Sequence, residues 1–207
     1  NGGIVGAGGL EDEVNGTLML NGTNSFAGGI NLNSGTLQIG GAGLLGDTNG
    51  NYGGNITNSG VLQYSSSATQ TLSGVVSWYG NVVKDGSGTL ILAGNNTYFA
   101  DTFISNGVLQ VTGTLANDVG NDYVYDITDN GTLRMSGSSV QTLSGIISGS
   151  GSLIMDGSGT LNINNTANTY TGDTIANGGT LDYNPNTVSY STPVNSLVIN
   201  NGGTVLV

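Results

Sequence analysis

Carboxylates are the main side chains with which this chain could do chemistry. The 207 residues include 13 Asp and Glu, 2 Lys and Arg, and neither Cys nor His. Without imidazole and thiol groups there are no Ser-His or Cys-His pairs for nucleophilic catalysis, no His or Cys ligands for zinc, and no disulfides. Only carboxylate, hydroxyl and amide chemistry remains.

The densest acidic segment, residues 117–131, offers four carboxylates to a cation: Asp118, Asp122, Asp126 and Asp129. Ca²⁺ binds about six to eight oxygens, but this spacing matches neither the EF-hand loop nor the calcium-binding nonapeptide. We therefore expect a solvated loop with no metal or cofactor, and we keep these aspartates as a weak calcium candidate. Glu11, Asp12 and Glu13 are likewise expected to form a solvated edge.

The charge balance excludes anionic partners. Lys84 and Arg134 are the two cations of a chain whose formal net charge is -11. Two cations cannot form a basic patch, so we expect no binding to nucleic acid or to acidic membrane surfaces. No apolar run approaches the ~20 residues that cross a bilayer, and no signal-peptide pattern follows Asn1. We expect no membrane insertion of this segment.

A repeated motif organises the elements that carry these side chains. Gly, then Thr or Val, and then Leu or Val recur in nine copies from Gly16 to Gly203. The steps between copies are 19, 25 and 28 residues and then recur with little change, so that three units of about 72 residues fill the chain. The segment QTLSG at 70–74 returns at 141–145.

Apolar and polar residues alternate within each copy, as at Leu90 and Leu92, which indicates half-buried strands. Short strands that return to the same motif after about 24 residues describe the coils of a solenoid. We predict an all-β fold, a parallel β-helix of about nine coils in three super-repeats. All nine motif strands are expected to form one interior ladder: Leu18, Leu37, Leu62, Leu90, Leu109, Leu133, Leu161, Leu181 and Val205.

Aromatic residues are the better candidates for binding. Phe26, Tyr98 and Tyr170 share one repeat position, where we expect them to cover the hydrophobic interior. A second set breaks the repeat pattern in the middle unit: Trp78, Tyr79, Phe99 and Phe103. Exposed Tyr and Trp stack on sugars or pack against protein surfaces. We predict these four residues as a binding surface.

Catalysis is the weaker interpretation, although parallel β-helices also include polysaccharide enzymes. Asp101 and Asp173 recur at one repeat position, which places them about three coils, or ~14 Å, apart. Glycoside hydrolysis needs two carboxyl groups within about 5 to 9.5 Å. The two cations occupy different repeat positions, so neither completes a lyase site. We expect no enzymatic activity and no catalytic residues.

Two segments, 86–113 and 157–184, resemble the autotransporter-associated β-strand repeat. Each segment contains GSGTL, then NNTY or NTYTGDT, and then NG followed by VL or TL. The match is looser in the first unit, where SFAGGI stands at 25–30. This family implies a right-handed parallel β-helix outside the cell, with adhesion or scaffolding more often than catalysis. Its recurring positions are structural, so the resemblance assigns no functional residues.

These observations predict one β-solenoid domain over residues 1–207, a segment of a longer repeat array. We expect a stalk that is secreted or displayed on a Gram-negative bacterium and mediates adhesion or cell-cell and biofilm contacts. A self-assembling filament subunit is the alternative, and a polysaccharide-acting enzyme the third class. Expected partners are further copies of the chain, joined end to end or laterally, and a host or bacterial surface protein or glycan.

Overall fold

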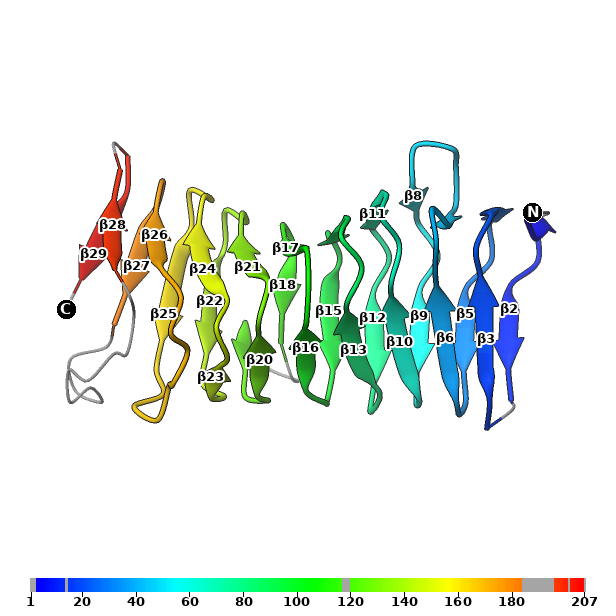
Figure 1. The fold of residues 1–207 in the computed structure, drawn as a ribbon, viewed down its shortest axis with the longest axis horizontal. Coiled ribbons are helices and arrows are strands. Elements are labelled where there is room, and N and C mark those ends of the chain that lie inside the picture. The colour runs from blue at the N-terminus through cyan, green and yellow to red at the C-terminus, as the bar shows by residue number, and fades with distance from the viewer. Residues whose placement is uncertain (1–2, 14, 117–119, 184–195, 201, 207) are drawn as a thin grey trace.

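Alternating apolar and polar residues fold into short parallel strands that stack along the axis of a rod (Figure 1). The computed structural model describes residues 3–13, 15–116, 120–183, 196–200 and 202–206. Within these ranges the chain forms strands and turns without a helix, so none of the described segments is a helix that could cross a membrane. The predicted parallel β-solenoid of about nine turns is confirmed.

Three strand positions follow one another in each coil. The first forms a seven-stranded sheet, which we call sheet 1. Its strands are β3 (Thr17–Leu20), β6 (Thr36–Ile39), β10 (Val61–Tyr64), β13 (Asn81–Lys84), β16 (Thr102–Ile104), β20 (Ile127–Asp129) and β23 (Ile147–Ser148).

The second position, sheet 2, is split by residues 46–50, which project from the rod between β7 and β8 (Figure 1). Before the split lie β1 (Val5–Gly6), β4 (Thr23–Phe26) and β7 (Leu44–Leu45). After it lie β8 (Asn51–Tyr52), β11 (Thr69–Leu72), β14 (Thr89–Leu92), β17 (Val108–Val111), β21 (Thr132–Met135), β24 (Ser152–Met155), β26 (Thr174–Ala176) and β28 (Leu197–Ile199).

The third position, sheet 3, is split in the same way between β18 and β19. Its first part contains β2 (Leu10–Asp12), β5 (Ile30–Leu32), β9 (Ile56–Asn58), β12 (Val76–Trp78), β15 (Asn95–Tyr98) and β18 (Thr114–Leu115). Its second part contains β19 (Asp122–Tyr123), β22 (Val140–Leu143), β25 (Thr160–Ile163), β27 (Thr180–Asp182) and β29 (Thr204–Leu206).

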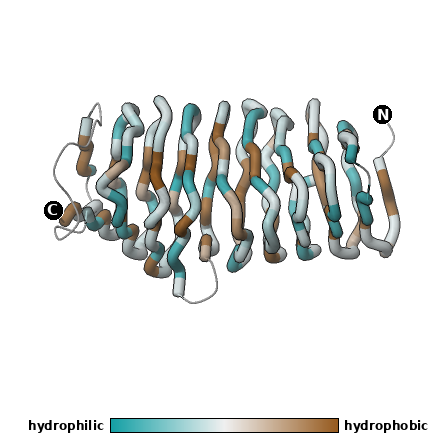
Figure 2. The backbone as a smooth tube through the Cα atoms, turned by 90° about the horizontal axis from the view of Figure 1, so that it is seen from below, coloured by the Kyte–Doolittle hydropathy of each residue, from teal (hydrophilic) through white to brown (hydrophobic). Residues whose placement is uncertain are grey.

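The core is the inside of the coil, to which alternate residues of every sheet point. Leu37, Leu109 and Leu161, one in each sheet, are completely buried. Figure 2 shows the same alternation, because hydrophobic and hydrophilic residues succeed one another along each turn of the tube. A single coil cannot bury its apolar side alone, so each coil depends on its neighbours for the core. Phe26, Tyr98 and Tyr170 are buried, as the sequence predicts.

The prediction of one nine-strand ladder is wrong, because the motif changes sheet between units. Leu62 pairs with Val82 and not with Leu90, and Leu133 pairs with Leu153 and not with Leu161. A step of 19 or 25 residues completes one coil, whereas the 28-residue step completes a coil and adds one more strand. Each unit therefore makes three coils plus one strand, and the repeat moves round the rod by one sheet per unit.

Lys84 lies inside the solenoid and is not a surface cation. It is the last residue of β13 and is completely buried. Its Nζ donates one hydrogen bond to the carbonyl of Gly86 and a second, at 3.0 Å, to the carbonyl of Asn106. Its ammonium group lies 5.7 Å from the ring centre of Tyr64. Desolvation lowers the pKa of Lys84 to about 8, against the opposing attraction of Asp85. Arg134, on β21, pairs with Asp156 at 3.2 Å.

Two carboxylates expected in solvent also point inward. Asp12 is buried on β2, so the prediction of a solvated edge is wrong for this residue, whereas Glu11 and Glu13 are exposed. Asp129 is 2% exposed at the end of β20. In both strands an apolar residue, the partly buried Leu10 or the buried Ile127, lies two positions earlier, and the period of two places the aspartate on the same inward side.

Candidate binding surface at the corner between sheets 3 and 1

Aromatic side chains gather where the chain turns from sheet 3 into sheet 1, on three successive coils. Trp78 and Tyr79 lie in one coil, Phe99 in the next, and Tyr125 in the one after. The ring centres are 5.6 Å apart for Trp78 and Tyr79, 5.3 Å for Tyr79 and Phe99, and 6.4 Å for Phe99 and Tyr125. We call these four residues the aromatic corner.

Trp78 is held in a backbone conformation that favours glycine. Its φ of 83° is positive, which holds for no other non-glycine residue in the described part of the chain. Counted along the repeat, the same position is occupied by Gly6, at φ 140°, and by Gly149, at φ 104°. A side chain in this region costs about 1–2 kcal/mol. The middle unit thus carries an indole where folding alone favours glycine.

The outer pair of rings is exposed to solvent. Trp78 keeps 51% of its surface exposed and Tyr79 keeps 66%, while Phe99 and Tyr125 are half-buried beside them. Large aromatic side chains normally contribute to stability by being buried. Because Trp78 and Tyr79 are exposed, their rings contribute little to the stability of the core and are available to a ligand.

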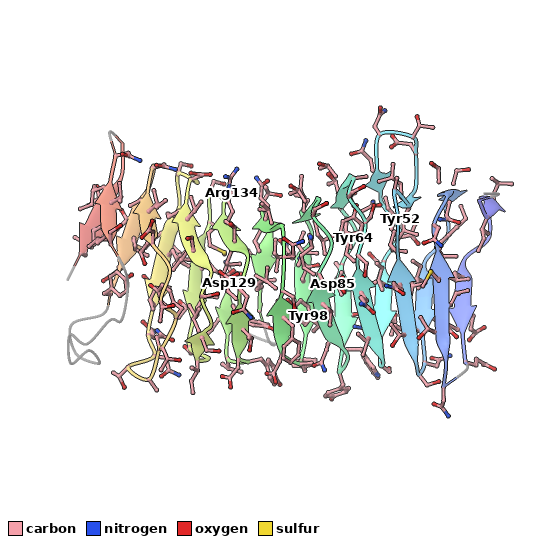
Figure 3. All side chains as sticks on the ribbon, viewed as in Figure 1. Tyr52, Tyr64, Asp85, Tyr98, Asp129 and Arg134 are labelled. Carbon is pink, nitrogen blue, oxygen red and sulfur yellow. The ribbon has the colours of Figure 1, made fainter. Side chains whose placement is uncertain are left out.

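Buried tyrosines support the corner from inside. The ring of Tyr123 lies 5.9 Å from that of Tyr125 and 5.5 Å from that of Tyr98. Hydrogen bonds join the hydroxyl groups of Tyr98 and Thr102 at 2.8 Å, and of Thr102 and Tyr123 at 2.7 Å. Burial raises the pKa of Tyr98 and of Tyr123, so both stay neutral and keep these bonds over the physiological range. Figure 3 labels Tyr98 within the rod.

Carboxylates follow the rings at the same corner. Asp101 Oδ1 accepts a hydrogen bond from the backbone N–H of Asp126 at 3.0 Å, and Asp126 Oδ1 accepts one from the N–H of Ile146 at 2.8 Å. Each aspartate is thus oriented by the coil that follows it. An ionised carboxylate accepts several hydrogen bonds, so both groups retain capacity for a ligand's hydroxyl groups.

The structure brings together three of the four residues predicted as a binding surface. Trp78, Tyr79 and Phe99 form the corner, but Phe103 lies on β16 in sheet 1, paired between Val83 and Thr128. The sequence reasoning missed Tyr125 because the 25-residue step there places it opposite Ala100 and not opposite Phe99. The aromatic pair Tyr123 and Tyr125, two residues apart, was the available signal.

Among the residues that the structure describes, the calcium candidates do not gather at one site. Asp118 lies outside the described residues. Asp126 is exposed at the corner, whereas Asp129 is buried with its carboxylate bonded to the N–H groups of Gly131 at 2.9 Å and Leu133 at 3.2 Å. Within the described ranges no group of three or more acidic residues could hold a metal ion.

The carboxylates considered for catalysis also lie apart. Asp101 precedes β16 in sheet 1, and Asp173 precedes β26 in sheet 2. The change of sheet from unit to unit separates them round the rod as well as along it. These two residues therefore do not form an acid and base pair.

Comparisons with known proteins agree with the repeat. Residues 15–39, 82–111 and 153–182 match the passenger-associated-transport-repeat family. The adhesin BmaC autotransporter of Brucella suis biovar 1 (strain 1330) is 34% identical over 56% of this chain. Two extracellular serine proteases of Serratia marcescens are 42% identical over 27% of the chain and 46% identical over 20% of it.

This chain spans only 4 to 5% of the length of these relatives. No solved structure matches it. Three segments of this chain thus match the passenger-associated-transport-repeat, and the relatives indicate an autotransporter-like, secreted or cell-surface protein of Gram-negative bacteria.

Proposed function

We propose that this segment is an adhesive stalk, one part of a longer β-solenoid array, and that it binds its target through the aromatic corner. The exposed Trp78, in a backbone position that the other units give to glycine, is the observation that carries the proposal. The similarity to an autotransporter adhesin supports it, although the matched part is a small share of that protein.

The parallel coils suit a stalk because backbone pairing continues without interruption along sheet 1, from β3 to β23. Such a rod projects a surface away from its base and resists bending, since every coil is held by the coils on both sides. The corner keeps its shape in this setting because buried Tyr98 and Tyr123 pack behind it.

We further propose that this segment has no enzymatic activity. The sequence holds no His or Cys, and Asp101 and Asp173 lie in different sheets. The similarity to extracellular serine proteases does not argue against this, because it covers about 5% of their length. Incubation with casein and with plant and bacterial polysaccharides should release no peptides or sugars; release that survives repurification would contradict the proposal.

Bead adhesion tests the stalk function. Beads coated with the 207-residue chain are expected to attach to bacterial biofilm and to epithelial cells more than beads coated with albumin. Beads that carry Trp78→Gly together with Tyr79→Ser should attach no better than albumin beads. Phe103→Ser is the matched control, because it removes a partly exposed aromatic ring from sheet 1, and should attach like the wild type. Equal attachment of the double variant and the wild type would overturn the proposal.

Self-association is a second proposal, favoured by apolar side chains on β28 and β29. Leu197, Ile199 and Leu206 are 42%, 54% and 49% exposed. A further coil would cover them, whether it came from the same polypeptide or from a second copy. Sedimentation at rising concentration should show end-to-end oligomers, and Ile199→Lys should reduce them. A chain that stays monomeric at high concentration would exclude this second proposal.

A further inference from the structure

We propose that the aromatic corner binds a neutral, linear glycan that lies along the rod axis, with its sugar rings against Trp78 and Tyr79 and its hydroxyl groups on Asp101 and Asp126. This inference rests on the proposed adhesive function, because it names the ligand class of the same surface. It is carried by four features of the corner: its backbone strain, its linear arrangement, its charge and its small area.

The strain at Trp78 points to a ligand. A residue in the left-handed region persists where the surrounding structure holds it, and such residues cluster at functional sites. Here the indole is half exposed, so its burial does not explain the strain. Gly6 and Gly149 show that the same turn forms without any side chain at this position. What the indole adds is an exposed aromatic surface.

The arrangement of the rings favours a linear ligand. The four residues occupy three consecutive coils, and neighbouring coils are about 4.8 Å apart. The ring centres of Tyr79, Phe99 and Tyr125 follow at 5.3 and 6.4 Å. An extended polysaccharide repeats its pyranose rings at a comparable spacing. Sugar rings present apolar C–H faces, which carry a positive partial charge and contact the negative faces of aromatic rings.

The charge at the corner favours hydroxyl groups and excludes acidic sugars. Asp101 and Asp126 follow Phe99 and Tyr125 closely in the sequence, and each is oriented by one backbone N–H of the next coil. Among the described residues, the two cations are engaged elsewhere, Lys84 inside the core and Arg134 with Asp156. A uronic acid or sulfate group would meet carboxylates on a chain of net charge -11, without a counter-charge.

The small area argues against a folded protein as the ligand. A stable protein interface buries about 800 Å² on each partner. A large aromatic side chain contributes about 150–250 Å² when it is completely buried. Two half-exposed rings and two more deeply buried ones supply a few hundred square ångströms at most. This is enough for two or three sugar units but well below the core of a protein interface.

Fluorescence of the single tryptophan reads out the site directly. The 207-residue chain is titrated with neutral hexasaccharides derived from cellulose, chitin, xylan and mannan, and with hexagalacturonate and a heparin hexasaccharide as acidic probes. We expect a saturable change in Trp78 emission with at least one neutral probe and none with the acidic probes. Tyr79→Ser and Phe99→Ser should each weaken binding about tenfold or more. Phe103→Ser should bind like the wild type.

Three results would each overturn the glycan proposal: no response to any neutral probe, tighter binding of an acidic probe, or unchanged affinity in Tyr79→Ser. An emission change that depends on protein concentration and not on sugar would instead assign the corner to a second copy of the chain, and would also overturn it. Circular dichroism of each variant confirms that the solenoid is intact, so that lost binding is not lost folding.

The bead experiment separates this inference from the proposed function. Attachment that depends on Trp78 in a chain that binds none of the sugars would overturn the glycan ligand and leave adhesion in place. Sugar binding without any attachment to biofilm or cells would overturn adhesion and leave the glycan site in place. Attachment that is inhibited by the bound hexasaccharide would support both.

Discussion

The side chain of Gln70 pairs with the backbone of Leu45 as one strand pairs with the next. Its Oε1 accepts a hydrogen bond from the N–H of Leu45 at 2.7 Å, and its Nε2 donates to the carbonyl of Leu45 at 3.1 Å and to that of Gly50 at 2.9 Å. The amide thus fills the place where residues 46–50 leave sheet 2. Gln141 makes the same contacts with Leu115 and Asn121 where sheet 3 is split.

We expect Gln70→Leu to destabilise the first unit by about 2–3 kcal/mol, because it leaves the buried N–H and carbonyl of Leu45 without their partner. Urea unfolding measures the loss, and hydrogen exchange should show that the Leu45 amide exchanges faster. Gln110→Leu is the control, since Gln110 is half-buried on β17 and should change stability by about 0.5 kcal/mol or less. Equal effects of the two substitutions would contradict a special role for Gln70.

Asp129, which Figure 3 labels, occupies the repeat position that Asn58 occupies one unit earlier in the sequence. Asn58 donates its amide to the carbonyl of Asn81 at 2.9 Å, which an ionised carboxylate cannot do. Burial raises the pKa of Asp129 from 3.8 to about 6, against its two backbone N–H donors. The folded protein therefore holds a proton that the unfolded chain releases between pH 4 and 6, and stability from this group falls as the pH rises through that window.

Asp129→Asn should consequently stabilise the protein near pH 7 by about 2 kcal/mol and remove this fall between pH 4 and 6. Thermal unfolding of wild type and variant at several pH values measures both effects. Asp126→Asn is the matched control, because it makes the same replacement at an exposed carboxylate and should change stability at pH 7 by about 0.5 kcal/mol or less. A variant with the wild-type slope would show that Asp129 is not the titrating group.

Lys84 occupies the repeat position that Met155 occupies in the next unit. Desolvation lowers its pKa from 10.5 to about 8, so the folded state binds fewer protons than the unfolded state between these values. Stability from this group is therefore reduced at pH 7 and recovers as the pH rises from about 8 to 10.5. Lys84→Met should raise stability at pH 7 by about 2 kcal/mol and flatten this rise. Denaturant midpoints at pH 7 and 9.5 test it, and a less stable variant at pH 7 would contradict it.

Trp78→Gly should change the free energy of unfolding by about 1 kcal/mol or less. Relief of the positive φ offsets the lost ring contact with Tyr79 and the extra backbone freedom of glycine. Tyr98→Ala, at a buried ring in the neighbouring coil, should cost about 3–5 kcal/mol. Thermal unfolding compares the two. A loss at Trp78 as large as at Tyr98 would mean that the indole is a packing residue and not an exposed binding group.

The strands could be predicted because alternation within each repeat is local. Residues two positions apart point to one side of a strand in any environment, as Leu90 and Leu92 do. The same rule also identifies Lys84 and Asp129 as inward residues, two positions after Val82 and Ile127. The sequence-based interpretation placed them in solvent because they are charged, and did not apply the two-residue alternation to them. In the structure, buried carbonyl and N–H groups of the turns form hydrogen bonds with both side chains.

The aromatic corner was harder to predict because it depends on which coils are neighbours. Trp78, Tyr79 and Phe99 were found from their departure from the repeat. Tyr125 joins them, and Phe103 does not, because the turn before β20 places one ring at the corner while β16 places the other on sheet 1. The position of a ring round the rod depends on how many residues the chain needs to complete each coil. The types of the residues do not give this number.

The amino-acid sequence alone determined the all-β character, the three units, the inward apolar residues and the absence of His and Cys chemistry, because these depend on composition and on local periodicity. Only the tertiary structure decided that Leu62 stacks on Val82, that each unit moves the motif to the next sheet, and that Tyr125 lies against Phe99. Turns of different length change the number of residues in a coil. Which strands then become neighbours is decided by backbone hydrogen bonds between segments that are distant in the sequence.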